Sequence, residues 1–263
     1  MKILVTGPRG FVGARVMASL KDAAIPAPSL RDADESAVRR LVDDTAPDLI
    51  IHTAAISDIQ TCERNPEASR RANVDLPVWL VRTGIPAVIF SSDQVYSGCR
   101  EPGPYTEDQA DPVNLYARQK WEMEQRTLEI NPGTVLLRAA WMYDLPLYGF
   151  PNRGNFLMNM LCSRELSFSS SQHRSFTYVR EVAEHILAAS RLPGGVYNYG
   201  SENDLTALET ALWLRDRLSL PVRLTDAGPL HALWMDGSKT RAAGIPFRTV
   251  IQGLEQCIQD YGL

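Results

Sequence analysis

Short apolar runs alternate with longer amphipathic segments through the first half of the chain. The apolar runs predict strands at 2–6, 24–28, 47–55, 86–92 and 134–138. Two prolines interrupt the second run, so we expect this strand away from the centre of the sheet. Between the runs, apolar residues at helical spacing predict helices that end near residue 21 or span 35–45, 66–81 and 114–130. This alternation predicts an α/β fold, a doubly wound parallel sheet covered by helices on both faces.

The regular pattern ends near Tyr143, although Ala139 to Trp141 is expected to continue the fifth strand. A loop rich in proline, glycine and aromatic residues follows, and the remaining patterns predict helices at 155–164, 207–218 and 249–261, a helix ending at Ser190, and a strand at 195–198. We therefore expect a main domain, 1–143, to which a segment near 176–198 returns. Residues 144–175 and 199–263 are expected to form a smaller subdomain.

A glycine turn joins the first strand to the first helix. Gly7, Gly10 and Gly13 are spaced G-x-x-G-x-x-G. Glycines in this place let the backbone approach a pyrophosphate, which the free N–H groups of the helix N-terminus can bind. The turn therefore predicts a dinucleotide-binding loop, and a plain strand-to-helix turn is the alternative.

Two further strand ends carry candidate chemistry. Ala54 and Ala55 end the third strand, and their small side chains allow a ring or a ribose to pack on the backbone, or else serve close packing. The fourth strand ends in Ser91, Ser92 and Asp93. Ligands of open α/β sheets bind at the carboxyl ends of the strands, so we expect these residues at one edge.

Tyr116 and Lys120 lie four residues apart in the predicted helix 114–130, on one face. An ammonium group close to a phenol favours the phenolate, so we expect Lys120 to lower the pKa of Tyr116. The pair would then exchange a proton with a carbonyl or hydroxyl group. A chance pair on a solvated helix is the alternative, and the other motifs favour the catalytic interpretation.

Composition narrows the class of protein. Among 263 residues, 44% are hydrophobic and 22% charged, which is ordinary for a globular protein. The net charge of −4 predicts no nucleic-acid partner, and the sequence contains no run suited to a membrane span. Four widely spaced cysteines and no signal peptide predict a cytoplasmic protein without a metal site. None of the four histidines is assigned to catalysis.

The four motifs occur in the order in which extended short-chain dehydrogenase/reductases carry them, and the chain resembles that family. It is most similar to the dTDP-4-dehydrorhamnose reductase branch, and the similarity covers nearly the whole chain. Besides the four motifs, the stretches 114–122, 137–141, 155–159 and 236–241 are similar to that branch. The resemblance implies a Rossmann-type dinucleotide-binding domain at 1–143 and a C-terminal substrate-binding subdomain.

The resemblance also implies roles for individual residues. Tyr116 would be the general acid, Lys120 would bind the nicotinamide ribose, and Ser92 would bind the substrate carbonyl. The cofactor would lie against Gly7, Arg9, Gly10, Phe11, Val12, Gly13, Arg31, Asp32, Ala54, Ala55 and Ile56. The nucleotide-diphosphate sugar would lie against Ser92, Asp93, Trp141, Asn155 and Arg174, and Arg174 would bind the diphosphate.

The second strand favours NADP(H) over NAD(H). No carboxylate stands at its tip, where one would bind the ribose and repel a 2′-phosphate. The first charged residue after the strand is Arg31, and Arg9 in the glycine turn is a second cation that could reach the phosphate. Asp32 is expected beside the adenine and not beside the ribose.

Some relatives form a magnesium-linked dimer through an acidic residue at the position of Arg15, so we expect no such metal here. A homodimer is still possible.

The leading functional hypothesis is an NAD(P)H-dependent reductase of a nucleotide-linked 4-keto sugar. An epimerase or dehydratase on the same fold is one alternative. Ser92-Asp93-Gln94 lacks the Asp-Glu pair that a dehydratase usually needs. A non-catalytic NADP-binding regulatory subunit, which the family also contains, is an alternative of a different class. The Tyr-x-x-x-Lys motif does not separate it from an enzyme.

Overall fold

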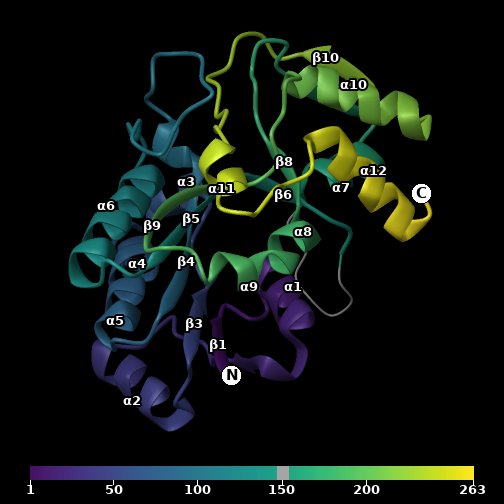
Figure 1. Ribbon diagram of the computed structural model, residues 1–263. Coiled ribbons are helices and arrows are strands. Elements are labelled where there is room, and N and C mark those ends of the chain that lie inside the picture. The colour runs from purple at the N-terminus through teal and green to yellow at the C-terminus, as the bar shows by residue number, and fades with distance from the viewer. Residues whose placement is uncertain (147–153) are drawn as a thin grey trace.

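A six-stranded parallel sheet forms the centre of the computed structural model, which describes residues 1–146 and 154–263 (Figure 1). The strand order is β2-β1-β3-β4-β5-β9, so the chain reverses direction across the sheet between β1 and β3. The strands are β1 Ile3–Thr6, β2 Ala24–Pro26, β3 Leu49–His52, β4 Ala87–Ser92, β5 Val135–Ala139 and β9 Gly195–Tyr199. The predicted α/β parallel sheet is confirmed, and the proline-containing β2 is an edge strand as expected.

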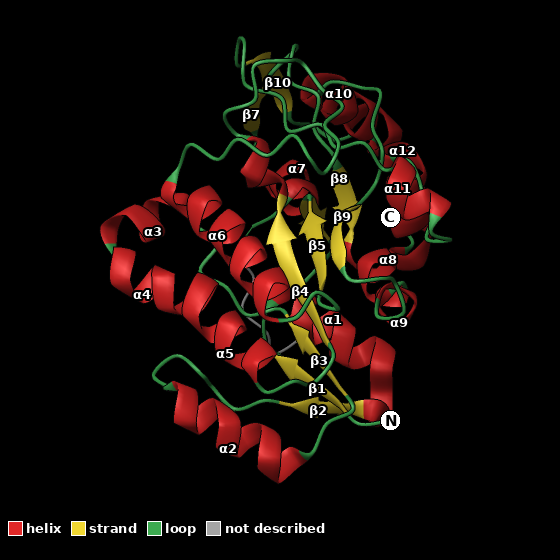
Figure 2. Ribbon diagram, turned by 60° about the vertical axis from the view of Figure 1, so that its left-hand side comes forward, coloured by secondary structure: helices red, strands yellow, loops and turns green. Residues whose placement is uncertain are grey.

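Helices cover both faces of the sheet (Figure 2). Because successive residues of a strand point to opposite faces, Ile3 and Val5 face one helical layer and Leu4 faces the other. The first layer consists of α1 Phe11–Leu20, α8 Val179–Glu184 and α9 Ile186–Ala189; the second contains α2 Glu35–Thr45, α5 Leu76–Arg82 and α6 Leu115–Ile130. A 3₁₀ turn, η1 Lys21–Ala23, leads from α1 into β2.

The predicted helix 66–81 differs from a regular α-helix. It consists of α4 Pro66–Arg70, a π-helical turn η2 Arg71–Asp75 and α5. A π turn inserts one residue into the helical register and is frequent at functional sites. Apolar periodicity predicted the helix but not the interruption. The short helix α3 Ile59–Arg64 before it was not predicted either.

A second group of elements has its own apolar core and lies beyond the carboxyl ends of the sheet strands (Figure 1). Its helices are α7 Phe156–Cys162, α10 Ala207–Leu218 and α12 Val250–Tyr261, whereas α11 Ser238–Ala242 packs against β9 of the main sheet. Two small parallel sheets pair β6 Trp141–Tyr143 with β8 Phe176–Tyr178 and β7 Glu165–Phe168 with β10 Arg223–Asp226. Trp141 therefore begins a separate strand and does not continue β5, which corrects the sequence-based expectation. Most of the loop predicted at 144–154 lies outside the described residues.

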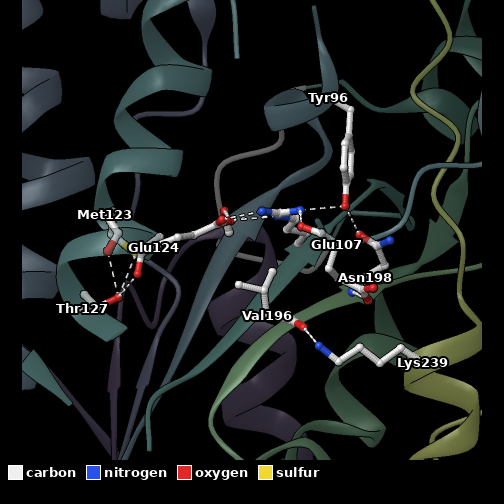
Figure 3. A network of polar contacts seen from close by, with 10 residues as sticks. Tyr96, Glu107, Met123, Glu124, Thr127, Val196, Asn198 and Lys239 are labelled. Atoms are coloured by element: carbon white, nitrogen blue, oxygen red, sulfur yellow. Dashed lines mark hydrogen bonds and ion pairs between the residues drawn. The ribbon is translucent and has the colours of Figure 1, made fainter. Parts of the chain in front are cut away.

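A buried ion pair joins α6 to β5 (Figure 3). Arg138 donates from Nε and Nη2 to the two oxygens of Glu124, at 3.0 and 2.7 Å, and the two side chains are 2% and 0% exposed. Arg138 Nη1 also donates to the hydroxyl of Tyr96, which lies in the 3₁₀ turn η3 Asp93–Tyr96. The Tyr96 hydroxyl donates to Asn198 of β9. This network therefore connects four elements in the interior of the protein.

Glu124→Gln should destabilise the protein by about 3–5 kcal/mol, because it leaves a buried guanidinium without its counter-charge. Glu122→Gln is the matched control on the same helix. Glu122 pairs with Arg70, and the two side chains are 36% and 46% exposed, so its loss should cost less than about 1 kcal/mol. Urea unfolding of the three proteins measures both values. Equal small losses would show that the buried pair does not stabilise the fold.

Candidate functional site

The glycine turn after β1 is packed tightly against the end of β3. Gly7 has a φ of +68°, and a Cβ on it would lie 2.9 Å from the backbone nitrogen of Ala54. A Cβ on Gly13 would lie 2.1 Å from the carbonyl oxygen of Gly7. Gly10 is different, because a Cβ there would meet nothing nearer than that same oxygen at 3.2 Å. Gly7 and Gly13 thus allow the strand and the helix to approach each other, while Gly10 is less confined, with the carbonyl oxygen of Gly7 as its one close neighbour.

A cavity of about 1070 Å³ opens beside this turn. Its walls are the glycine turn, the loop after β2, the end of β3, and the helical segment from α3 to η2. Eight of the predicted cofactor residues line it: Gly7, Arg9, Gly10, Arg31, Asp32, Ala54, Ala55 and Ile56. It is as large as typical cofactor pockets and lies where the strand order reverses, the usual ligand position in such sheets.

Five predicted cofactor residues do not line this cavity: Phe11, Val12 and Gly13 of α1, and Tyr116 and Lys120 of α6. Phe11, Val12 and Gly13 form the first turn of α1. The ring of Phe11 lies 4.4 Å from the guanidinium of Arg15, and Val12 packs against the core. Arg15 is itself 6% exposed and pairs with Asp144 at 3.0 Å.

Tyr116 and Ser92 meet where α6 passes the end of β4. Tyr116 is 6% exposed, and its pKa is raised, first by burial, while a hydrogen bond with Ser92 acts in the opposite direction. The nearby carboxylate of Asp93 raises the pKa further. The expected lowering of this pKa by Lys120 was therefore wrong for the structure described here, because desolvation of the phenolate dominates. The phenol keeps its proton at neutral pH.

Lys120 lies one turn further along α6 and is 2% exposed. Its ammonium group donates to the carbonyl oxygen of Phe90 at 2.8 Å. Burial lowers the pKa of Lys120 to about 8, and the nearby carboxylate of Glu124 partly opposes this shift. A lysine with this pKa retains a charge at neutral pH at an energetic cost, which is common at functional sites.

Asp93, Arg174 and Trp141 form a second cluster next to Ser92. The Ser92 hydroxyl donates to Asp93 at 3.1 Å, and Arg174 Nη2 lies 3.3 Å from the other carboxylate oxygen. The guanidinium of Arg174 stacks on the ring of Trp141 at 3.6 Å. Burial raises the pKa of Asp93 and lowers that of Arg174, and their attraction opposes both shifts. Trp141 is 50% exposed, so the cluster extends from the buried tyrosine to the surface.

Asn155, which was predicted to bind the substrate, forms no hydrogen bond with the described residues of this cluster. Its side-chain oxygen accepts from the backbone nitrogen of Met158 and caps α7. Its amide nitrogen donates to the carbonyl oxygen of Asp144 at 2.8 Å. Both polar ends of Asn155 therefore stabilise local structure.

Sequence reasoning missed Asn73, which lies in the π turn and is fully buried. Its amide accepts from the backbone nitrogen of Ile56 and donates to the carbonyl oxygen of the same residue, both at 2.9 Å. It also donates to Gln119, the neighbour of Lys120. Asn73 thus fixes the cavity wall at Ile56 relative to the tyrosine helix. Asn73 has the only amide side chain in the predicted helix 66–81, and this was the signal available in the sequence.

The parallel sheet, the glycine turn, the serine motif at the end of β4 and the Tyr-x-x-x-Lys motif on α6 define an extended short-chain dehydrogenase/reductase. The family model described as RmlD substrate binding domain matches residues 1–233, and the chain belongs to this family. The family predicted from the sequence is thereby confirmed.

Similar proteins have several different names. The chain is 26% identical to spore coat polysaccharide biosynthesis protein SpsK of Bacillus subtilis, over 83% of this chain and 80% of that protein. It is 28% identical to methionine adenosyltransferase 2 subunit beta of Xenopus laevis, over 94% and 84%. A crystal structure of dTDP-4-dehydrorhamnose reductase from Bacillus anthracis, in complex with NADP, superposes with a TM-score of 0.86 at 20% identity. The match covers 99% of this chain and 100% of that one.

No helix in the described ranges is long and apolar enough to cross a membrane.

Lys120→Met should raise the free energy of unfolding by about 2–3 kcal/mol at pH 7. The folded-state pKa near 8 lies below the usual 10.5, and each unit corresponds to about 1.4 kcal/mol, from which about 1 kcal/mol is subtracted for the lost hydrogen bond to Phe90. Between these two pKa values the unfolded chain binds more protons, so the parent gains stability as the pH rises. The advantage of the variant should therefore decline from pH 8 to 10.5. Chemical unfolding at pH 7 and 10 tests this, and a variant destabilised equally at both would contradict it.

Proposed function

We propose that this protein is an NAD(P)H-dependent reductase of a nucleotide-linked 4-keto sugar. The observation that carries the proposal is the buried Ser92–Tyr116 pair on the strand end and helix next to the cofactor-sized cavity. The relatives support an NAD(P)-dependent oxidoreductase, since the similar Bacillus anthracis structure is a reductase of this kind with NADP. In this proposal residues 1–143 bind the cofactor, and 144–175 with 199–263 bind the sugar nucleotide.

The residues around the cavity fit a dinucleotide. Among the described residues no side chain caps the N-terminus of α1, so its first N–H groups are available to a pyrophosphate. Gly10 lines the cavity and has no side chain, which allows a phosphate to approach the backbone. Arg9 and Arg31 add positive charge to the same cavity, which favours NADP(H) over NAD(H).

The proposed chemistry divides among the buried side chains. A bound dihydronicotinamide supplies the hydride to the carbonyl carbon of the substrate. Tyr116 donates its proton to the carbonyl oxygen, and the raised pKa ensures that the phenol carries this proton beforehand. Ser92 hydrogen-bonds the same oxygen as negative charge develops on it. Lys120 binds the nicotinamide ribose and places a positive charge near the reacting groups.

The cluster of Asp93, Trp141 and Arg174 is proposed to bind the substrate. Trp141 offers an exposed aromatic face, and Asp93 can accept hydrogen bonds from sugar hydroxyls. Nε of Arg174 is buried and has no partner among the described residues. A guanidinium with an unused donor is suited to a diphosphate oxygen, which would replace part of its interaction with Asp93.

A second candidate function is a non-catalytic NADP-binding regulatory subunit. The similarity to methionine adenosyltransferase 2 subunit beta over 94% of the chain favours it. The two candidates share a cofactor site but differ in turnover. Oxidation of NADPH on addition of a keto-sugar nucleotide supports the reductase, and cofactor binding without oxidation across a panel of such substrates supports the subunit.

Gly10→Val should weaken NADPH binding at least about tenfold while the fold is retained. Gly10 has a φ of −76°, which valine adopts easily, and its side chain would extend into the proposed pyrophosphate position. Ala18→Val, on the exposed side of the same helix, is the control and should bind normally. Calorimetry measures affinity and circular dichroism measures folding. If Gly10→Val binds NADPH as tightly as the parent, the glycine turn does not bind the pyrophosphate as proposed.

Tyr116→Phe should lower kcat by about 10²- to 10⁴-fold and leave cofactor affinity nearly unchanged, because it removes the proton donor but keeps the ring. Ser92→Ala should cost less, since it removes one neutral hydrogen bond. Tyr197→Phe is a control at a buried tyrosine whose hydroxyl donates to the carbonyl of Pro193. If Tyr116→Phe reduces keto-sugar nucleotides as fast as the parent, the proposed mechanism is wrong.

A further inference from the structure

Three arginines face the cofactor cavity: Arg9, Arg31 and Arg71. Within the described part of the chain, none of them forms an ion pair. Arg70 and Arg82, on the same helical segment as Arg71, pair with Glu122 and Glu35. Three carboxylates, Asp32, Asp58 and Glu67, line the same cavity, so its formal charges balance overall. A phosphate group is therefore favoured only where two of the arginines lie close together.

Arg71 is held in a defined position. It begins the π turn, is half-buried, and donates from Nε to the carbonyl oxygen of Ala33 at 3.2 Å. Ala33 follows Arg31 by two positions in the loop after β2. The terminal nitrogens of Arg71 form no hydrogen bond with a described residue, and its guanidinium lies over the ring of Trp79 at 6.0 Å. The π turn thus brings a second guanidinium against the loop that carries Arg31.

The loop after the second strand is where dinucleotide-binding folds contact the adenosine ribose. An acidic residue there binds the 2′-hydroxyl, whereas an arginine accommodates a 2′-phosphate. A phosphate monoester carries a charge of about −1.5 to −2 at neutral pH, which matches two guanidinium groups. Arg9 lies in the glycine turn, close to the proposed pyrophosphate position, and is not needed for this contact.

We propose that Arg71 determines cofactor specificity by binding the adenosine 2′-phosphate of NADP(H) together with Arg31. This inference rests on the proposed function of the cavity as the cofactor site. It extends that proposal, because the sequence predicted that residues at the second strand would select the cofactor. Arg71 instead comes from a helical segment far from that strand in sequence. Asp32 in the same loop opposes the phosphate, so the two arginines must outweigh its charge.

The test measures the affinity of the full-length protein for NADPH and NADH by calorimetry, in the parent and in two variants. Arg71→Gln keeps a donor that can reach Ala33 but removes the charge. It should weaken NADPH binding by about 10- to 100-fold, as expected for losing a hydrogen bond to a charged group, and change NADH binding less than about twofold. Arg70→Gln, at the neighbouring surface position, should change neither affinity. Competition by 2′-AMP and 5′-AMP isolates the phosphate, and 2′-AMP should lose its advantage in Arg71→Gln.

The outcomes separate this inference from the proposed function. Equal weakening of NADPH and NADH in Arg71→Gln, or a parent that binds NADH as tightly as NADPH, overturns the role of Arg71 and leaves the reductase proposal standing. A parent that binds neither dinucleotide overturns both. If Arg71→Gln does not fold, Arg31→Gln, at an exposed loop residue, should show the same selective loss of NADPH and 2′-AMP binding. If Arg31→Gln shows no selective loss of NADPH and 2′-AMP binding, the inference is overturned as well.

Discussion

The buried ion pair between Arg138 and Glu124 fixes the helix that carries the proposed chemistry. Glu124 lies one turn after Lys120 on α6, and it accepts from Arg138 of β5 and from Ser91 of β4. Because both charges are excluded from water, their favourable arrangement is limited to one geometry of helix against sheet. The same pair extends through Tyr96 to Asn198, whose amide donates to the carbonyl oxygens of Tyr105 and Asp236. Segments distant in sequence thus share one network.

Burial, more than pairwise attraction, determines the properties of the polar groups at the site. It raises the pKa of Tyr116 and Asp93 and lowers the pKa of Lys120, in each case by disfavouring the charged form. At neutral pH the shifts of Asp93 and Lys120 destabilise the folded state, and nearby partners compensate them only in part. The shift of Tyr116 has no such cost, because the phenol is protonated in both the folded and the unfolded chain. In the proposed mechanism, a tyrosine that retains its proton next to a buried lysine is suited to donate that proton to a substrate.

Two separate surfaces converge on the carboxyl edge of the sheet. The cavity lies beside the glycine turn, and the Asp93–Arg174–Trp141 cluster adjoins Ser92 and Tyr116. Asn73 connects the cavity wall to the tyrosine helix, because it binds the backbone of Ile56 in that wall and the side chain of Gln119 on α6. A cofactor on one side and a sugar nucleotide on the other would meet at the tyrosine.

The sequence by itself determined the parallel sheet, the regular helices and the positions of the four motifs, because buried strands, helix faces and tight turns leave local patterns. Helices 35–45 and 207–218 agree with the structure to the residue. It did not determine the π turn, the separate strand at Trp141, the bonds of Asn73 or the approach of Arg71 to the second-strand loop. The direction of the Tyr116 pKa shift was also decided by the tertiary structure. These features depend on which distant segments exclude water from a side chain or supply its partner, and only the folded chain brings those segments together.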